Sequence, residues 1–259
     1  MTTMVLAAGD EFVAPGVKDF FLPPIFGEVT KPMVLLVLSI LIIGVFFIAA
    51  TRNLKLVPSK FQFAAESLYD VGRNSIAREQ IGAKDFRPYV PLVLTIFTFI
   101  LVNNLFGLIP FVQFPTMSHI GFPLAVSLLV VYPVYHFAGI RRHGLVGYLK
   151  NQTMPPGAPW FVLPLLIPIE FFQKFVLNPL TLAIRVFAAM FAGHLLLLVF
   201  TLSGEYLLFA GGVTVVVAPV AFFFAIALTF LEALIMVLQA YIFALLSASY
   251  IGAALAEEH

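Results

Sequence analysis

The chain has 259 residues, of which 61% are hydrophobic and only 10% are charged, and its formal net charge is +1. Soluble domains carry roughly 25% charged residues, so this composition excludes an ordinary soluble protein and indicates an integral membrane protein. The near-neutral charge provides no basic surface for nucleic acid, and the absence of cysteine excludes disulfides, cysteine-ligated metal and a thiol nucleophile.

The N-terminal region is an acidic tail that leads into the first apolar run. Its acidic residues are Asp10, Glu11, Asp19 and Glu28. No basic segment precedes an apolar stretch, so a cleaved signal peptide is not expected. The run Met33–Ala50, of about 18 residues, is just long enough to span a bilayer. We expect residues 1–30 to form an outer tail and residues 31–259 a single membrane domain.

The segment Phe61–Glu79 alternates apolar and polar residues at helical spacing. The apolar positions are Phe61, Ala64, Ala65, Leu68, Val71 and Ile76, and the interleaved polar ones are Gln62, Glu66, Asp70, Arg73 and Arg78. This pattern predicts a helix that lies on the membrane surface. A solvated amphipathic linker is the alternative.

Four further apolar regions follow along the chain. Tyr89–Pro110 and Gly121–Gly139 are each about one bilayer thick. Trp160–Leu202 and Tyr206–Ala256 are much longer, about 64 and 76 Å as continuous helices, against a hydrocarbon core of about 30 Å. Each long region is therefore either one steeply tilted helix or two spans. The candidate break points are Pro179 in the first, and Gly211-Gly212 with Pro219 in the second.

The basic residues are distributed unevenly between the loops. Seven of the 14 Lys and Arg residues lie between the first and second spans, and Arg141, Arg142 and Lys150 follow the third. The segments 110–120 and 203–205, interpreted as loops, contain none. By the positive-inside rule the basic loops are cytoplasmic, or on the matrix side. This places the N-terminal tail outside and the C-terminus inside.

Motifs for soluble chemistry are absent from the sequence. It has no GxxxxGK[ST], GxGxxG or HExxH motif, and its five histidines lack the spacing of metal ligands. We therefore expect no cofactor, no metal and no direct nucleotide binding. His136 and His143 lie near a basic turn, and we interpret them as solvated residues of the membrane interface.

Polar residues are unusually frequent in the last two apolar regions. They are Glu170, Lys174, Asn178, Arg185, His194, Glu232 and Gln239. Charged side chains inside a membrane are costly and normally face the protein interior or water, where they pair. These residues are therefore the candidates for function.

The spacing of these residues separates them into groups. Asn178 and Arg185 are seven residues apart and share a helix face, as do Glu232 and Gln239, about 10.5 Å apart. Arg185 and His194 are nine residues apart, which places them on opposite faces about 13.5 Å apart along the axis. Arg185 and His194 are thus expected to meet different surroundings.

The chemistry of these side chains suggests a proton path with a barrier. Arginine stays protonated and acts as a fixed charge, whereas Glu232 and His194 can exchange protons near neutral pH. The structural alternatives are that Arg185 forms an ion pair with Glu232, and that His194 is a satisfied core histidine.

The remaining candidates also have structural alternatives. Glu170 and Lys174 are spaced i,i+4 and would neutralise each other near a helix end. Gln239 would form a hydrogen bond between helices. Small residues in "FAAMFAG" allow a neighbouring helix, of this chain or of another subunit, to approach closely.

Four stretches together resemble one known family. "PLTLAIRVFAAMFAGHLL" and "LEALIMVLQAYIFALLSASYIGAAL" are similar to the two C-terminal helices of subunit a of the F-type ATP synthase. "LTIFTFILVNNLFGLIP" and "YHFAGIRRHG" resemble its third helix and the end of its fourth, so the resemblance covers roughly residues 30–259.

The resemblance implies an all-α polytopic membrane protein. Its expected parts are one N-terminal span, a surface amphipathic helix at about 61–79, a two-helix hairpin, and two long tilted C-terminal helices at about 160–256. In this family the long helices are tilted, which favours tilt over two spans for each.

The resemblance also implies a stator subunit of the proton channel. Two aqueous half-channels would load and unload the carboxylates of a rotating c-ring, with Arg185 as the charge barrier. By the same resemblance, the outer half-channel contains His194, Glu232, Gln239 and Asn104, and Glu170 belongs to the inner one. The subunit itself is not catalytic.

The partners implied are the c-ring, the peripheral-stalk b subunits and membrane lipid, without nucleic acid. The expected location is a bacterial plasma membrane, with an organellar inner membrane as the alternative. Other functional hypotheses are a proton-coupled secondary transporter of an anionic substrate and a purely structural assembly subunit.

The chain departs from the family pattern at several positions. Ala188-Ala189 replaces a pair that commonly ends in asparagine, Gly121 and Pro123 replace asparagine and threonine, and the spacing from Glu170 to Arg185 is one residue longer than expected. These departures concern the channel lining rather than Arg185.

Overall fold

The structure, a computed structural model, describes residues 14–25, 27–110, 112–154, 161–212 and 214–256. Part of the expected outer tail, including Asp10 and Glu11, and the last three residues of the C-terminal tail lie outside these ranges. The described residues form helices without a β-strand, and five of the helical segments are long and apolar enough to span a membrane. The predicted all-α polytopic fold is confirmed.

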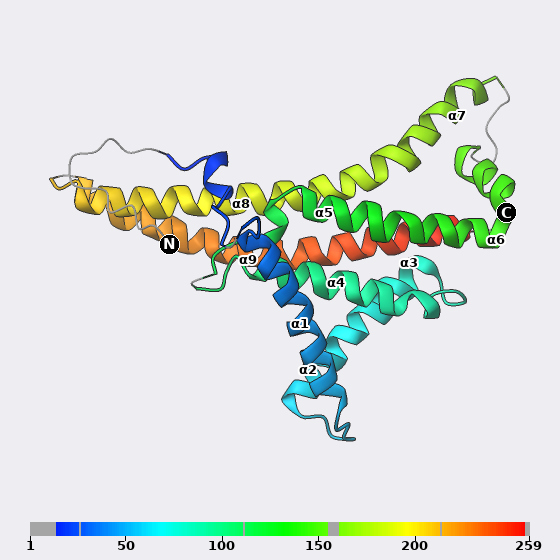
Figure 1. Ribbon diagram of the computed structural model, residues 1–259, viewed down its shortest axis with the longest axis horizontal. Helices are drawn as coiled ribbons and strands as arrows, with labels where there is room; N and C mark the ends of the chain where they lie inside the picture. Colours follow the sequence, from blue (N-terminus) through cyan, green and yellow to red (C-terminus); the bar gives the residue numbers. More distant parts are fainter. Residues whose placement is uncertain (1–13, 26, 111, 155–160, 213, 257–259) are drawn as a thin grey trace.

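The helices follow one another along the chain with short connections (Figure 1). The spans are α1 (Lys31–Thr51), α4 (Val90–Leu105), α5 (Gly121–Ala125) continued by η5 (Val126–Val131) and α6 (Tyr132–Thr153), α7 (Leu163–Phe172) continued by η6 (Gln173–Leu177) and α8 (Asn178–Phe209), and α9 (Thr214–Leu255). The remaining elements are η1 (Val17–Phe20), α2 (Lys60–Asp70), η2 (Val71–Arg78), α3 (Glu79–Ile81), η3 (Arg87–Tyr89) and η4 (Thr116–Ser118).

One long helix accounts for most of each long apolar region. The predicted break at Gly211-Gly212 is confirmed, but it lies near the start of the second region, and neither Pro179 nor Pro219 interrupts its helix. The segment α7–η6–α8 has 47 residues and α9 has 42, about 70 and 63 Å at 1.5 Å per residue. Such helices fit a bilayer only when strongly tilted, so the two-span alternative is wrong. They lie antiparallel along the long axis of the molecule (Figure 1).

Proline does not break the first long helix because a wider turn precedes it. Pro179 lacks an N–H and cannot form the usual bond to the preceding turn. The preceding η6 is a π-helical stretch, whose wider turn accommodates the missing hydrogen bond without ending the helix. The carbonyl of Pro179 also accepts a hydrogen bond from Ser127 Oγ at 2.7 Å, which fixes η5 against α8.

The turn between the long helices lies further along the chain than the sequence predicted. Residues 203–205, expected as a loop, belong to α8, where buried Gly204 packs against the ring of Phe222 in α9. The chain instead turns at Gly211 and Gly212, whose φ angles of 75° and 68° are readily available only to glycine.

The third span also extends beyond its predicted end. The apolar run ends at Gly139, but α6 continues through the basic residues to Thr153, with a kink at Gly144. Arg142 in α6 forms an ion pair with Asp85, just before α4, at 3.2 Å. This contact ties the residues before α4 to the middle of α6, and α4 and α6 both pack against α9.

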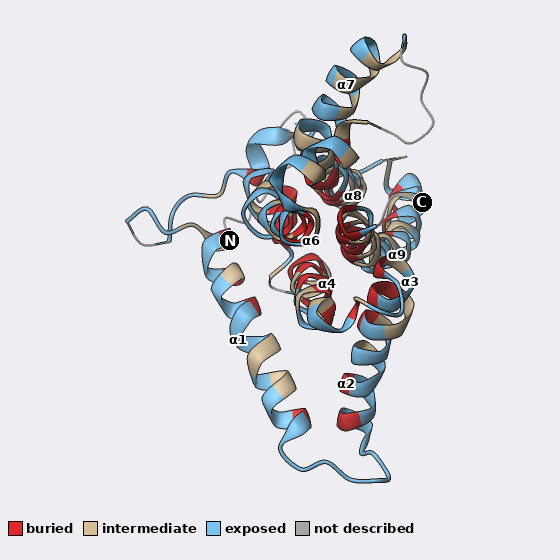
Figure 2. Cartoon of the chain, turned by 90° about the vertical axis from the view of Figure 1, so that its right-hand side faces the viewer, coloured by how far each residue is buried: buried red, intermediate tan, exposed pale blue. Residues whose placement is uncertain are grey.

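The first span is attached to the bundle by polar contacts and by Leu35, which is buried in an apolar cluster with Phe106 and Phe114. Asn103 Nδ2 in α4 donates to Ser39 Oγ in α1 at 2.9 Å, and both residues are fully buried. Lys31 Nζ donates to the carbonyl of Val112 at 2.6 Å. Most of α1 is exposed, and α1 and α2 diverge from the bundle as two arms (Figure 2).

The predicted amphipathic helix is present and slightly longer than expected. It comprises α2, η2 and α3, and its residues Ala65 and Ile76 are buried. Gln62, assigned to the polar face, is instead buried, because its side chain bonds Glu66 and both backbone groups of Lys55. Its location on the membrane surface remains a prediction.

The core lies where α4, α6, α8 and α9 meet (Figure 2). Its largest fully buried side chains include Tyr148, Phe243, Ile100, Leu182, Met190 and Met236. The C-terminal half of α9 is lined with alanine and glycine, which lets the neighbouring helices approach its backbone closely.

We predict that Gly252→Ala destabilises the protein by about 1–3 kcal/mol, the usual cost of overpacking. A Cβ at this position would overlap the backbone carbonyl oxygen of Gln80 in α3, which cannot rotate away. The matched control is Gly44→Ala in α1, where a Cβ meets no atom within 4 Å. The melting temperatures of the purified variants should differ clearly, and equal values would contradict the contact.

Candidate functional site

Arg185 lies on an exposed face of α8. Its side chain has no carboxylate within ion-pair distance among the residues that the structure describes, so the proposed structural ion pair with Glu232 is wrong. The same face of the helix carries further exposed residues, most of them small: Thr181, Ile184, Ala188 and Ala192. The result is a shallow stripe with one long cationic side chain.

The opposite face of α8 is buried against the rest of the bundle. It comprises Leu182, Ala183, Val186, Met190 and His194. Arg185 and His194 therefore meet different surroundings, as their nine-residue spacing predicted. Packing of α8 on α9 produces this division, and it places the arginine outside and the histidine inside.

His194 and Glu232 form a buried pair between α8 and α9. His194 Nδ1 lies 3.7 Å from Glu232 Oε1, and the two side chains are only 6% and 3% exposed. Neither carboxylate oxygen of Glu232 has a hydrogen-bond partner among the described residues. Burying a full charge without partners is costly, and the described residues offer Glu232 no ionisable partner other than His194.

An N-terminal segment that the sequence analysis did not single out lies beside this pair. The ring of Phe20, in η1, is 5.9 Å from the ring of His194 and is 3% exposed. His119 Nε2 donates to the carbonyl of Phe20 at 3.0 Å and holds the segment in place. These contacts join residues about 100 to 170 positions apart, and no local pattern indicates them.

Asn104 and Gln239 flank the pair along α9. Asn104 Nδ2, fully buried in α4, donates to the backbone carbonyl of Met236 at 3.2 Å. Met236 is one helical turn beyond Glu232, and Gln239 follows three residues later. The side-chain carbonyl of Gln239 is buried without a hydrogen-bond partner in the described chain, so the expected bond between helices is not formed there.

Glu170 lies apart from the other candidates, on α7. It forms the predicted i,i+4 ion pair with Lys174 at 3.3 Å, and both side chains are partly exposed. Lys174 Nζ also donates to the carbonyl of Gln152 in α6 at 2.7 Å. Fifteen residues separate Glu170 from Arg185, about 22 Å along the helix, and α7 diverges from the bundle (Figure 1).

His136 is not the solvated residue that we expected. It is buried, its Nδ1 is 2.7 Å from the hydroxyl of Tyr148, and its ring stacks on Phe175 at 4.7 Å. Tyr135 packs beside it and donates its hydroxyl to the carbonyl of Lys174 at 3.1 Å. The basic turn in the sequence suggested solvent, but the kink at Gly144 folds the rest of α6 back, so that Tyr148 covers His136.

No metal centre is present among the described residues, since no group of three or more His, Cys, Asp or Glu side chains is arranged to hold an ion. The spanning helices, the buried His194–Glu232 pair and the exposed Arg185 define a polytopic α-helical membrane protein that carries ionisable groups within its spans.

Comparison with known proteins identifies the family. The model of the family described as "ATP synthase A chain" matches residues 33–252. The chain is 48% identical to the ATP synthase subunit a of a Nocardioides species, covering 98% of this chain and 96% of that protein. It is 45% identical to that of Pseudarthrobacter chlorophenolicus over the full length of both, and 42% identical to that of Streptomyces lividans over 97% of this chain and 90% of that protein. The chain belongs to the ATP synthase A chain family.

We predict that Tyr148→Phe lowers stability by about 1 kcal/mol, because it removes the hydroxyl that pairs with His136 Nδ1. Tyr241→Phe is the matched control, since no hydrogen bond of the Tyr241 hydroxyl is found in the described chain. Thermal unfolding of the two purified variants provides the comparison. Equal melting temperatures would show that the buried pair contributes nothing.

Proposed function

We propose that this chain is the stator subunit of the proton channel in an ATP synthase. The observation that carries the proposal is the division of α8 into two faces, with exposed Arg185 on one and His194, paired with Glu232, on the other. Family membership supports it, because the relatives are named ATP synthase subunit a.

The exposed arginine requires a partner from outside this chain. An arginine in an apolar span costs from about 3 kcal/mol upward unless it is compensated, and the described residues supply no carboxylate to it. A c-ring that moves past the stripe of small residues would bring its carboxylates to Arg185 one at a time. The small side chains Ala188 and Ala192 allow the ring helices to approach closely.

The attraction between Arg185 and a ring carboxylate would be strong enough to hold the carboxylate and weak enough to release it. A carboxylate about 4 Å from Arg185 is favoured by roughly 4 kcal/mol at an effective dielectric near 20. Moving one charge through 100 mV supplies about 2.3 kcal/mol. The attraction is comparable to the driving force, so the arginine would hold a deprotonated carboxylate, exclude direct proton leakage and still release it.

Two separate routes would deliver protons to either side of this gate. In the outer half-channel, His194 and Glu232 would exchange protons, with Asn104 and Gln239 shaping the path around them. The exchange does not depend on which of the two helices carries the histidine and which carries the glutamate. The inner half-channel would include Glu170, at the partly exposed start of the first long helix.

The remaining assignments follow from this role. The c-ring would lie against the Arg185 face, and the peripheral-stalk b subunits against the exposed arms α1 and α2. The subunit would be non-catalytic, with nucleotide handled elsewhere in the complex. Its location would be a bacterial plasma membrane with the C-terminus in the cytoplasm, in accord with its bacterial relatives and its basic loops.

The structure offers less support for an anion transporter. In that hypothesis Arg185 would bind substrate inside the protein, as substrate sites of such transporters lie between their repeats. Arg185 instead lies on an exposed face of α8.

We predict that Arg185→Ala lowers the rate of ATP-driven proton pumping by roughly two orders of magnitude or more. This is the change expected if most of an attraction of about 4 kcal/mol is lost. Passive proton leakage should rise at the same time, because the charge barrier is gone. Both are measured in membrane vesicles with assembly verified. Arg52→Gln, an exposed arginine after α1, is the control and should pump normally. Normal pumping by Arg185→Ala would refute the barrier.

A second prediction concerns the buried pair. His194→Ala or Glu232→Ala should each slow pumping at least tenfold, whereas the double exchange His194→Glu with Glu232→His should recover much of the loss, because it restores one acid beside one base. Pumping rates of the three variants in vesicles provide the test. If the double exchange pumps no faster than the single variants, pumping requires histidine at 194 and glutamate at 232 specifically, and an acid beside a base is not sufficient.

A further inference from the structure

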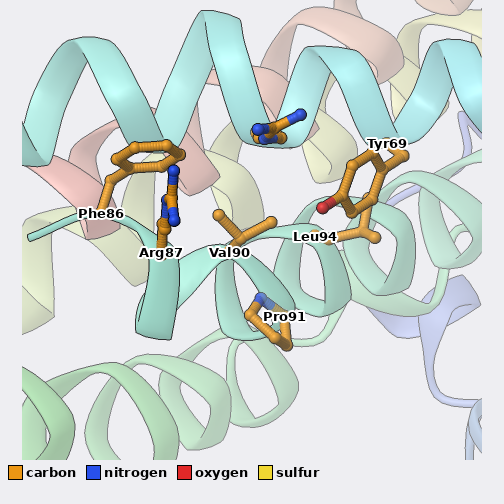
Figure 3. Close-up of a pocket in the computed structure, with 7 residues that line it drawn as sticks. Tyr69, Phe86, Arg87, Val90, Pro91 and Leu94 are labelled. Carbon is orange, nitrogen blue, oxygen red and sulfur yellow. The ribbon is translucent and has the colours of Figure 1, made fainter. Parts of the chain in front are cut away.

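An open pocket lies between the amphipathic helix and the start of α4, away from the proton-path candidates. Its volume is about 520 Å³. The residues that line it are Tyr69, Arg73, Phe86, Arg87, Val90, Pro91 and Leu94. Arg87 and Tyr69 lie at opposite ends of the pocket, with Val90 between them (Figure 3).

Both arginines of the pocket are available to an external anion. Arg73 and Arg87 are exposed, and neither forms an ion pair with another described residue. Three nearby carboxylates already have other partners: Asp85 pairs with Arg142, Asp70 accepts from Asn74, and Glu66 accepts from Gln62. Two guanidinium groups that form no ion pair in the described chain therefore line one pocket.

The rest of the pocket is mainly apolar. Phe86 and Val90 are 5% exposed and form a fixed wall. Leu94 is held in place by the close approach of η2, since a Cβ on Gly72 would lie only 3.2 Å from its Cδ1. The hydroxyl of Tyr69 adds a hydrogen-bond donor. A charged end and an apolar wall suit an amphiphile better than a free ion.

We propose that this pocket binds the phosphate headgroup of an anionic phospholipid. Arginine forks bind phosphate through paired charge-assisted hydrogen bonds, and the apolar wall would contact the first part of an acyl chain. The pocket belongs to a basic segment of the chain, and basic clusters next to membrane helices attract anionic lipid. The bound lipid would fix the amphipathic helix to α4, independently of any proton transfer.

The test measures lipid binding directly. Short-chain phosphatidylglycerol is titrated onto the full-length chain within its purified, detergent-solubilised complex, and retained lipid is counted by native mass spectrometry. Arg73→Gln and Arg87→Gln should each weaken binding about fivefold, the equivalent of ~1 kcal/mol per basic residue at an anionic surface. The double variant should bind about 25-fold more weakly. Arg78→Gln, on η2 but outside the pocket lining, should have little effect.

Two further arms identify the chemistry that is recognised. Phosphatidylcholine should bind more weakly than phosphatidylglycerol, and inorganic phosphate at millimolar concentration should not displace the lipid. Arg73→Lys with Arg87→Lys should keep part of the affinity, since it keeps the charge but loses the fork. Unchanged binding in the double Gln variant, equal binding of both lipids, or displacement by free phosphate would each overturn the proposal.

Discussion

The antiparallel packing of α8 on α9 is the interaction on which the rest of the structure depends. It buries one face of α8 and leaves the other open, so a single helix presents His194 to Glu232 on one side and Arg185 outward on the other. The packing is tight because small residues lie at the contact, for example Gly204 against Phe222. The other helices support this pair: Asn104 fixes α4 to α9, and Ser127 fixes η5 to α8.

The two faces of α8 carry ionisable side chains in an apolar protein, and the cost of these charges is met differently on each face. His194 and Glu232 are buried beside each other, so each has an ionisable partner within the chain. Arg185 cannot lose its proton, and the described chain does not neutralise it. In our proposal a carboxylate of the c-ring supplies that compensation at the exposed arginine face. This asymmetry explains how one chain could separate two proton routes without a moving part of its own.

The sequence predicted the local features of this arrangement well. Helical spacing separated Arg185 from His194, and the i,i+4 spacing of Glu170 and Lys174 predicted their ion pair. Features that depend on distant contacts were missed: Phe20 reaches His194 only through the fold, and His136 is covered by Tyr148, which the kink at Gly144 brings back against it. The turn at Gly211-Gly212 was misplaced because Gly204, which resembles a loop residue, serves a helix contact. Whether Pro179 breaks a helix also depends on the turn before it, and composition does not specify that turn.

Cysteine crosslinking tests whether the Arg185 face of α8 meets the c-ring, as we propose. The chain has no cysteine, so Ala188→Cys introduces a unique thiol on the exposed face. Paired with a single cysteine beside the ring carboxylate, it should form a disulfide rapidly under mild oxidation of assembled membranes. Ala183→Cys, on the buried face, should not. Efficient crosslinking from Ala183 but not from Ala188 would contradict the account, because it would place the ring on the other side of the helix.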